Sequence, residues 1–333
     1  MQNEILDTPT LYALAEQAMQ QYDLQYQGKI KLLCQSENAT FVIQTPNTKY
    51  ALRLHRPNYH SKKAIQSELL WLDALTEHGI SVPQAITNKD GEYVLTLKYS
   101  SKIERHAVLF NWVQGEMPTT DVDPKAFKQL GSITAQLHQH SKQWQRPDHF
   151  NRIIWDHDTM VSSEGHWGHW ADVKNLTQLD KTLLQETVHT IGTQLKQLDK
   201  SPQYYGLIHA DLRLTNLLLQ DNKIGIIDFD DCGLSWFMHD LAAALSFNEH
   251  LPHAPEWVDQ WLNGYEQHAH ISQLEYALIP SFIMQRRIQM LAWTGSHADT
   301  EMTKSLGNHW IKETTRLCKQ YLKHDDVMPL GAA

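Results

Sequence analysis

Two short runs of β-favouring residues lie near the start of the chain. Residues 40–44 and 50–54 flank a turn at 45–48, and this arrangement predicts a β-hairpin. The next segment, residues 61–78, carries apolar side chains at helical spacing and is followed by Gly79. A helix that ends at this glycine is therefore expected.

The same pattern predicts further elements in the first third of the chain. Residues 9–22 have the spacing of a helix, and residues 92–97 and 107–113 have the composition of strands. An antiparallel sheet with helices is therefore expected over residues 1–110, as a smaller N-terminal lobe.

From about Pro124 onward the pattern becomes mainly helical. Residues 127–140 give the clearest helical spacing, and short strands are expected at 217–220 and 224–227. This change of element type predicts an α+β protein with two lobes, the second of them a larger, mainly α-helical lobe over residues 111–333.

Composition supports a folded, globular protein of this size. The 333 residues are 41% hydrophobic and 20% charged, which excludes a disordered or low-complexity chain. The formal net charge is −9, without a run of Lys and Arg that would track a phosphate backbone, so we expect no nucleic-acid partner.

The apolar runs, the first residues and the cysteines of the chain indicate its cellular compartment and the state of its thiols. Its apolar runs fall short of the roughly 18 residues that cross a bilayer, and its first residues resemble no signal peptide. We therefore expect a cytoplasmic protein without membrane association. Cys34, Cys232 and Cys318 are odd in number and far apart, which fits neither a disulfide framework nor a thiolate metal site. The oligomeric state is not fixed by the sequence.

The strongest chemical pattern lies at residues 209–228. It has the form H-x-D-x4-N, then a strand, a turn and a strand, then D-F. With the turn centred on Asn222, a regular hairpin would set Asn216 opposite Asp228, with their Cβ atoms roughly 5 Å apart. An amide oxygen and a carboxylate so placed suit Mg²⁺ bound together with phosphates. Asp211, in the loop that leads into the hairpin, is suited to accepting a proton from a substrate hydroxyl.

This pattern resembles the catalytic core of the protein-kinase-like superfamily, specifically its aminoglycoside phosphotransferase, choline kinase and homoserine kinase branch. Ala210 and Asp230 stand where protein kinases usually have Arg and Gly, and both fit the small-molecule branch better. The resemblance implies a two-lobed kinase fold with an ATP-binding N-terminal lobe. It also implies that Asp211 is the catalytic base.

The resemblance implies roles for further residues around Asp211. Asn216 and Asp228 would be metal ligands, and His209 would brace the catalytic loop. Arg213 would meet the γ-phosphate. Asp240 resembles the acidic start of a family helix whose carboxylate steadies the catalytic loop.

The smaller lobe is expected to supply a cation for the phosphates. Ala51 and Arg53 share one face of a strand and match the A-x-K spacing of kinases, with Arg in place of Lys. Glu68 lies in the apolar stripe of the next helix, where a carboxylate needs a partner, so we expect an Arg53–Glu68 ion pair. The alternative is a surface acid beside a surface arginine.

Two further segments are expected to contact the nucleotide. Residues 35–39 lie where a phosphate-covering loop would be, although they contain no glycine. Residues 107–113 resemble the strand that leads into the kinase hinge. In that strand the backbone at Asn111, Trp112 and Val113 would meet adenine.

Aromatic and acidic residues between 144 and 170 allow two interpretations. They form either a pocket for an amine, because ring faces and carboxylates attract cations, or part of the core with solvated acids, which we favour. The residues are Trp144, Trp155, Asp156, Asp158, Glu164, Trp167 and Trp170.

Other candidate groups have weaker patterns. The spacing of His157, His166 and His169 does not indicate zinc. Arg286 and Arg287 suit a substrate anion, but ion pairing on a helix surface is the expected use.

We therefore expect an ATP- and Mg²⁺-dependent kinase that phosphorylates a hydroxyl of a small molecule, such as an amino alcohol, an amino acid or an aminoglycoside. Two alternatives remain open. One is a protein Ser/Thr kinase of the bacterial stress-response type, which the short segment between Phe229 and Asp240 disfavours. The other is a non-catalytic nucleotide-binding pseudokinase, which Arg53 in place of Lys keeps open.

Overall fold

A computed structural model of the chain forms two compact units. The first comprises Met1–Met117, Gln145–Arg152 and Leu217–Asp230, and the second comprises Pro118–Trp144, Ile153–Asn216 and Asp231–Ala333. The structure describes residues 6–35, 37–100, 103–118, 124–221, 223–298, 300–323, 328 and 330–331.

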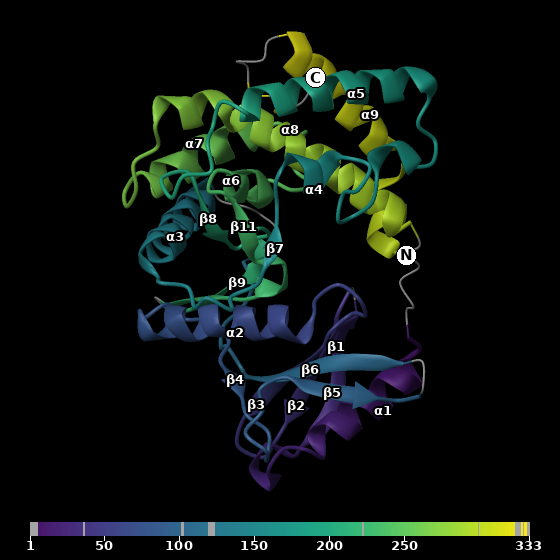
Figure 1. The fold of residues 1–333 in the computed structure, drawn as a ribbon, viewed down its shortest axis with the longest axis vertical. Helices are drawn as coiled ribbons and strands as arrows, with labels where there is room; N and C mark the ends of the chain where they lie inside the picture. The colour runs from purple at the N-terminus through teal and green to yellow at the C-terminus, as the bar shows by residue number, and fades with distance from the viewer. Residues whose placement is uncertain are drawn as a thin grey trace. The chain divides into compact units, whose positions relative to one another are not determined.

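The first unit is built on an antiparallel sheet. The strand order is β1-β2-β3-β6-β4, and β5 also pairs with β6 (Figure 1). The elements of this unit are α1 (Thr8–Met19), a 3-10 turn at Leu24–Tyr26, β1 (Lys29–Gln35), β2 (Ala39–Gln44), β3 (Lys49–Leu54), α2 (Lys62–Glu77), β4 (Ala85–Ile86), β5 (Leu95–Lys98) and β6 (Glu104–Asn111). The predicted hairpin at 40–54 and the predicted helix at 61–78 are confirmed.

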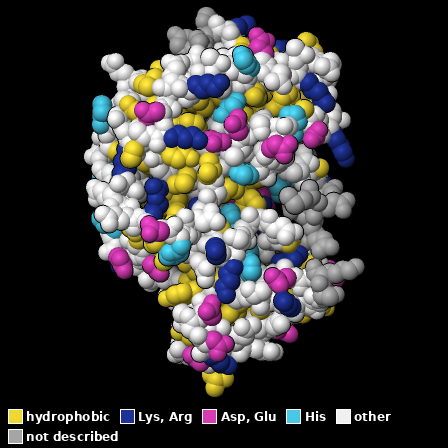
Figure 2. Space-filling model, in the orientation of Figure 1, with side chains coloured by type: hydrophobic (Ala, Val, Ile, Leu, Met, Phe, Trp, Pro, Cys, Tyr) yellow, Lys and Arg dark blue, Asp and Glu magenta, His cyan; other side chains and the backbone are white. Residues whose placement is uncertain are grey.

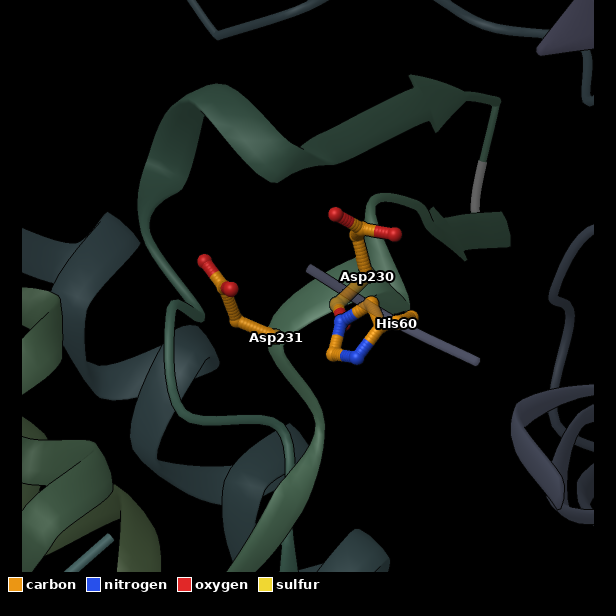
Figure 3. A group of neighbouring side chains, drawn as sticks. All are labelled: His60, Asp230 and Asp231. Carbon is orange, nitrogen blue, oxygen red and sulfur yellow. The ribbon is translucent and has the colours of Figure 1, made fainter. Parts of the chain in front are cut away.

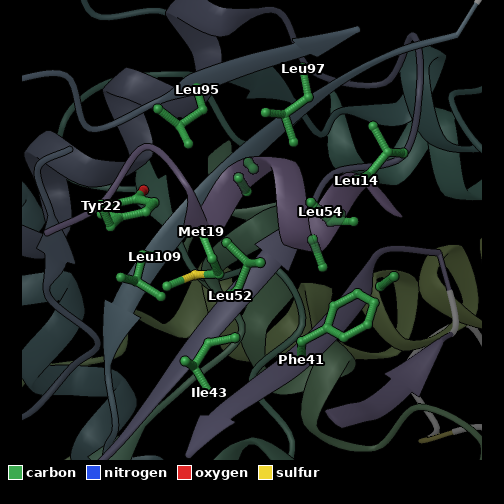
Figure 4. Close-up of a cluster of buried hydrophobic side chains, with 14 of the residues drawn as sticks. Leu14, Met19, Tyr22, Phe41, Ile43, Leu52, Leu54, Leu95, Leu97 and Leu109 are labelled. Carbon is green, nitrogen blue, oxygen red and sulfur yellow. The ribbon is translucent and has the colours of Figure 1, made fainter. Parts of the chain in front are cut away.

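Burial of one sheet face produces the core of this unit. Side chains alternate between buried and partly exposed along β2, so that Phe41 and Ile43 point into the core. The helix α1 contributes Leu14 and Met19, and Leu52 of β3 lies beside Met19 (Figure 4). Each such side chain contributes roughly 1.5–3 kcal/mol when it leaves water.

Local signals set the ends of α2, which carries one of the predicted site residues. The Ser61 side chain accepts a hydrogen bond from the Ala64 backbone N–H, which caps the helix N-terminus. Gly79 follows its C-terminus with a φ of 84°, a left-handed conformation that glycine adopts without strain.

The hairpin β9 (Leu217–Gln220) and β10 (Lys223–Ile226) belongs to the first unit. Its register pairs Gln220 with Lys223 and Leu217 with Ile226. The loop therefore has two residues, 221 and 222, of which Asn222 lies outside the described residues. The predicted turn over 221–223, centred on Asn222, is therefore wrong, because the sequence does not distinguish it from a two-residue turn. The ladder ends at Leu217 and Ile226, before it reaches Asn216 or Asp228.

The second unit is mainly helical, as predicted. Its helices are α3 (Pro124–Gln143), α4 (His157–Val161), α5 (Gln178–Leu195), α6 (His239–Ala244), α7 (Ala254–Tyr265), α8 (Gln273–Ser296) and α9 (Glu301–Lys323). The helices α5, α8 and α9 pack on one another (Figure 1). A small sheet of order β7-β11-β8 was not predicted, because its strands β7 (Ile153–Ile154), β8 (Tyr205–Ile208) and β11 (Gly233–Trp236) have at most four residues.

Charged side chains of both signs are mixed on one face of the molecule (Figure 2). On the face that Figure 2 shows, Lys and Arg side chains are interspersed with Asp and Glu and do not gather in one patch. Among the described residues, we find no helix with both the length and the apolar character required to cross a bilayer.

Two glycines allow α3 and α7 to approach closely. A Cβ atom at Gly131 would lie 2.0 Å from the Trp261 carbonyl oxygen, and one at Gly264 would lie 1.8 Å from the Lys128 carbonyl oxygen. Each helix therefore places a glycine against the backbone of the other. A larger residue at either position must push the helices apart.

We predict that Gly131→Ala lowers the free energy of unfolding of the second unit by about 1–3 kcal/mol or more, because the added methyl group overlaps backbone. Urea unfolding measures this, with Gln136→Ala, at an exposed position of the same helix, as the control within about 0.5 kcal/mol of the wild type. A gain of about 1 kcal/mol, as is usual for Gly→Ala within a helix, would contradict the close approach.

Candidate active site

The loop with the H-x-D-x4-N pattern connects β8 to a 3-10 turn at Leu214–Asn216. Its backbone is held by Asp240, in the first turn of α6. The Ala210 N–H donates to Asp240 Oδ1 at 2.8 Å, and the His209 N–H donates to Asp240 Oδ2 at 3.2 Å. Ala210 has a φ of 67°, a conformation that non-glycine residues rarely adopt. The prediction that Asp240 steadies this loop is confirmed.

Asp240 is itself fixed by a buried chain of polar groups. Its Oδ2 lies 2.9 Å from His138 Nε2, and His138 Nδ1 lies 2.9 Å from the Tyr265 hydroxyl. Burial alone would raise the pKa of Asp240, but the His138 hydrogen bond and other nearby groups hold it below its ordinary value. Burial lowers the pKa of His138, so the imidazole is neutral, with Nε2–H donating to Asp240 and Nδ1 accepting from Tyr265.

Asp211 is paired with two arginines of the second unit. Its Oδ1 lies 2.7 Å from Arg286 Nη2, and its Oδ2 lies 2.9 Å from Arg213 Nη2. The Asp211 backbone N–H donates to His209 Nδ1 at 3.4 Å. The structure thus brings together His209, Asp211 and Arg213, three of the predicted catalytic residues.

Asn216 also contacts this loop. Its Nδ2 donates to the Asp211 backbone carbonyl at 2.8 Å, and the side chain is buried. Because the amide nitrogen is used in this bond, the amide oxygen is the atom left for a cation.

Arg286 and Arg287 do not lie on a helix surface, so that expectation is wrong. The two side chains are 1% and 0% exposed, in a helix, α8, that is buried on nearly all sides. Arg287 pairs with Glu249 at 2.6 Å and lies over the Trp310 ring. The apolar residues on both sides of this arginine pair in the sequence were the signal for burial, since a surface helix has an apolar stripe on one face only.

In the first unit, Arg53 and Glu68 form the predicted ion pair. Arg53 Nη2 lies 2.6 Å from Glu68 Oε1, and both side chains are buried. Burial alone would lower the pKa of Arg53, but Glu68 and Asp230 raise it overall, so the guanidinium stays charged. The helix phase of Glu68, together with the kinase-like spacing of Ala51 and Arg53, predicted this pair.

The other predicted nucleotide-binding residues of this unit lie on β3 and at the end of β6. Ala51 pairs with Phe110 in the ladder, and Asn111 is the last residue of β6. Trp112 and Val113 follow in an irregular segment, with Lys49 over the Trp112 ring. Their backbone is therefore outside the strand ladder.

Asp230 connects several segments of the first unit, which the sequence did not indicate. Its carboxylate accepts a hydrogen bond from Asn38 Nδ2 at 2.9 Å and lies 3.3 Å from His55 Nδ1. Its backbone carbonyl lies 2.7 Å from His60 Nε2, as Figure 3 illustrates, and also accepts from Arg152. Burial would raise the pKa of Asp230, but the bond from His55 and the charge of Arg53 hold it well below the ordinary range.

This network explains why Asp follows Phe229 where protein kinases have Gly. Asn38 lies in the predicted phosphate-covering segment, whose Ser36 is outside the described residues. The Asn38 side chain accepts from the Arg56 backbone N–H at 2.9 Å and donates to the Asp230 carboxylate. It therefore connects this segment both to Arg56 and to Asp230. Asp228, two residues before Asp230, is exposed. Its φ of 67° is a strained conformation for a residue other than glycine.

The aromatic residues between 144 and 170 serve mainly the core of the second unit, as favoured. Trp155, Trp167 and Trp170 are buried, whereas Trp144 is half-buried. Asp156 caps α4 and pairs with Lys200 at 2.8 Å. Among the histidines whose spacing does not indicate zinc, His157 Nδ1 lies 3.0 Å from Gln285 Oε1 and His166 Nε2 lies 3.1 Å from the Ile154 carbonyl oxygen.

Two buried histidines make stability depend on pH. Burial and the charge of Arg152 lower the pKa of His60 to about 3, and burial and Arg286 lower that of His239 to about 3. Below pH 6.5 the unfolded chain therefore takes up protons that the folded chain does not. We predict that the free energy of unfolding falls by about 1 kcal/mol per pH unit for each histidine as the pH drops from 6.5 towards 3.

Urea unfolding between pH 7 and pH 5 measures this dependence. His60→Gln and His239→Leu each remove one titrating group, so each variant should show a smaller loss of stability with acidification in its own unit. Equal slopes in the wild type and both variants would contradict the assignment.

Comparison with known proteins gives the chain a family. A model described as the phosphotransferase enzyme family matches residues 32–276. An amicoumacin kinase from Bacillus subtilis is 22% identical over 271 residues, which cover 78% of this chain and 78% of the relative. A homoserine kinase from Rhodopseudomonas palustris is 25% identical over 258 residues, which cover 73% of this chain and 71% of the relative.

Solved structures agree with this result. The structure of a microcompartment-associated aminopropanol kinase is 35% identical with a TM-score of 0.89, and the match covers 96% of this chain and 99% of that one. An amicoumacin kinase in complex with AMP-PNP and Ca²⁺ shares the fold, with a TM-score of 0.75 at 22% identity and 93% of each chain covered. These matches confirm the α+β, protein-kinase-like fold. The chain belongs to the phosphotransferase enzyme family and is an ATP-dependent kinase that acts on a hydroxyl group of a small molecule.

Proposed function

We propose that the protein transfers the γ-phosphoryl group of ATP to the hydroxyl of a small amino alcohol, with Mg²⁺ as the metal. The observation that carries this proposal is the likeness to an aminopropanol kinase, which is 35% identical over nearly the whole of both chains. A loop that fixes Asp211 beside two arginines is consistent with phosphoryl transfer, because such catalysis depends mainly on positioning and charge.

Asp211 acts on the attacking hydroxyl. The bond between the γ-phosphorus and the oxygen that bridges to the β-phosphate breaks, and a bond between phosphorus and the substrate oxygen forms. The hydroxyl proton passes to the Asp211 carboxylate and then to solvent, and ADP leaves. Oδ2 accepts from both Nη2 and Nε of Arg213, whereas Oδ1 accepts from Arg286 alone among the described residues and keeps a second lone pair, which accepts the substrate hydroxyl.

Asn216 and Asp228 are the proposed metal ligands. An amide oxygen and an exposed carboxylate are hard donors, which suits a divalent cation such as Mg²⁺. Bound there, the cation would neutralise charge on the triphosphate.

The first unit is proposed as the ATP-binding lobe. Arg53, oriented by Glu68, offsets charge on the α- and β-phosphates. The backbone at Asn111, Trp112 and Val113 meets adenine, and Ala51, on the same strand as Arg53, lines the nucleotide site. The guanidinium in place of the usual ammonium gives two donors in one plane, which suits phosphate oxygens.

The two alternatives are less well supported. The relatives named above act on small molecules by their names, and the matches to them span the chain. A protein Ser/Thr kinase and a non-catalytic pseudokinase are therefore not favoured.

We predict that an amino alcohol stimulates ADP release from Mg²⁺-ATP more than hydroxy amino acids, sugars, aminoglycosides or a generic peptide pool. The panel is measured with purified protein in a coupled ADP assay, with Asp211→Asn as the inactive control. Stimulation by the peptide pool alone would contradict the proposed substrate class.

Two variants distinguish the binding of Mg²⁺-ATP from the phosphoryl-transfer step. We predict that Asp211→Asn lowers kcat by at least about 1,000-fold, because the proton acceptor is lost, yet binds Mg²⁺-ATP as the wild type does. Asp228→Ala should weaken Mg²⁺-ATP binding by about tenfold or more, whereas Asp148→Ala, at another exposed aspartate of the first unit, should not. Isothermal titration and steady-state kinetics measure both. Full activity in Asp211→Asn and Asp228→Ala would refute the site assignment.

A further inference from the structure

The Arg286 side chain is a buried cation with a partner at each of its nitrogens. Nη2 lies 2.7 Å from Asp211 Oδ1, Nε donates to Ser246 Oγ at 2.9 Å, and Nη1 donates to Gln289 Oε1 at 3.1 Å. The guanidinium carbon lies 4.9 Å from the centroid of the Trp167 ring. Three hydrogen bonds and a ring therefore fix the guanidinium in one orientation.

Burying this charge is costly, so its position needs a reason. The side chain is 1% exposed, and a buried guanidinium loses its hydration unless a carboxylate and other acceptors replace the water. The carboxylate that pairs with it is Asp211, the residue proposed to accept the substrate proton. A fully buried cation on that carboxylate is not needed for the fold of α8, because an apolar residue of similar volume would pack there at less cost.

The turn after α6 contacts both arginines that pair with Asp211, which are Arg213 and Arg286. Ser246 accepts from Arg286, and the ring of the next residue, Phe247, lies 5.8 Å from the Arg213 guanidinium. Phe247 has a φ of 73°, a strained conformation for a bulky side chain. In this conformation the neighbouring side chains of Ser246 and Phe247 lie against Arg286 and Arg213, respectively.

The two arginines differ in exposure. The Arg213 side chain is 28% exposed, whereas that of Arg286 is 1% exposed. Arg213 can therefore exchange its contact with Asp211 for a phosphate oxygen. Arg286 is enclosed by Ser246, Gln289 and the Trp167 ring, so it stays on Asp211.

We propose that Arg286 is a positioning residue that fixes the Asp211 carboxylate while Arg213 engages the transferred phosphate, and that Ser246 orients Arg286 for this role. The proposal rests on the proposed function of Asp211 as the proton acceptor. Arg286 acts through Asp211 and does not itself contact the reacting atoms. Loss of the contact lets the carboxylate leave the geometry that transfer requires, and a displacement of about 1 Å costs on the order of 100-fold in rate.

The test compares Arg286→Met, Arg286→Lys and Ser246→Ala by steady-state kinetics with Mg²⁺-ATP and the best amino alcohol. We expect Arg286→Met to lower kcat about 100-fold and to change KM for ATP by less than about threefold. Arg286→Lys should recover part of the loss, because an ammonium keeps the charge but not the planar set of donors. Ser246→Ala leaves both charges in place and should lower kcat several-fold.

The matched control is Arg287→Met. Arg287 is the next residue of α8, is equally buried and pairs with Glu249, but it does not contact Asp211. If burial of a charge in α8 is all that matters, both methionine variants lose stability and activity alike. We expect Arg287→Met to lower Tm at least as much as Arg286→Met and to keep kcat within about threefold of the wild type at a temperature where both are folded.

The outcomes separate this inference from the proposed function. Full activity in Asp211→Asn would overturn the proposed function and the inference with it. An inactive Asp211→Asn together with wild-type kcat in Arg286→Met and Ser246→Ala would overturn the positioning role alone. If Arg286→Met does not fold, Ser246→Ala and Arg286→Lys decide the question, because unchanged kcat in both would also overturn it.

Discussion

The loop that carries Asp211 depends on one buried carboxylate. Asp240 accepts hydrogen bonds from two consecutive backbone N–H groups, those of His209 and Ala210, and the second of these residues has a left-handed φ. An alanine there costs of order 1–3 kcal/mol, so the conformation persists only because its surroundings over-determine it. The conformation sets the direction in which the next side chain, Asp211, leaves the backbone.

Each unit has its own buried aspartate that ties backbone segments together. Asp240 in the second unit is held by His138, and Asp230 in the first unit is held by His55 and Asn38. In both cases the nearby donors keep the carboxylate ionised although burial opposes its charge. A carboxylate serves this purpose well because it accepts several bonds at once, so one side chain can tie together separate backbone segments.

Local patterns were sufficient to predict much of the fold and part of the site. The hairpin at 40–54 and the helix at 61–78 follow from periodicity over a few residues, and the Arg53–Glu68 pair follows from helix phase together with the resemblance to kinases. Contacts between distant segments were not predictable in this way. The bond between Asn38 and Asp230 joins residues 192 positions apart, and the two-residue turn of β9–β10 shifted the register by one. Arg286 was misplaced because charge suggested a surface, while the surrounding apolar residues indicated burial.

The central claim is that Asp211, in the loop held by Asp240, promotes transfer of the γ-phosphoryl group of ATP to a carbon-bound hydroxyl of a small amino alcohol. Phosphorus-31 NMR of the protein with Mg²⁺-ATP and each of several amino alcohols, an aminopropanol among them, tests it most directly. The account predicts a phosphomonoester signal that grows as the γ-phosphate signal declines and that shows coupling to a carbon-bound proton of the acceptor. Inorganic phosphate alone, or a phosphoramidate formed on the amine, in every mixture would contradict it.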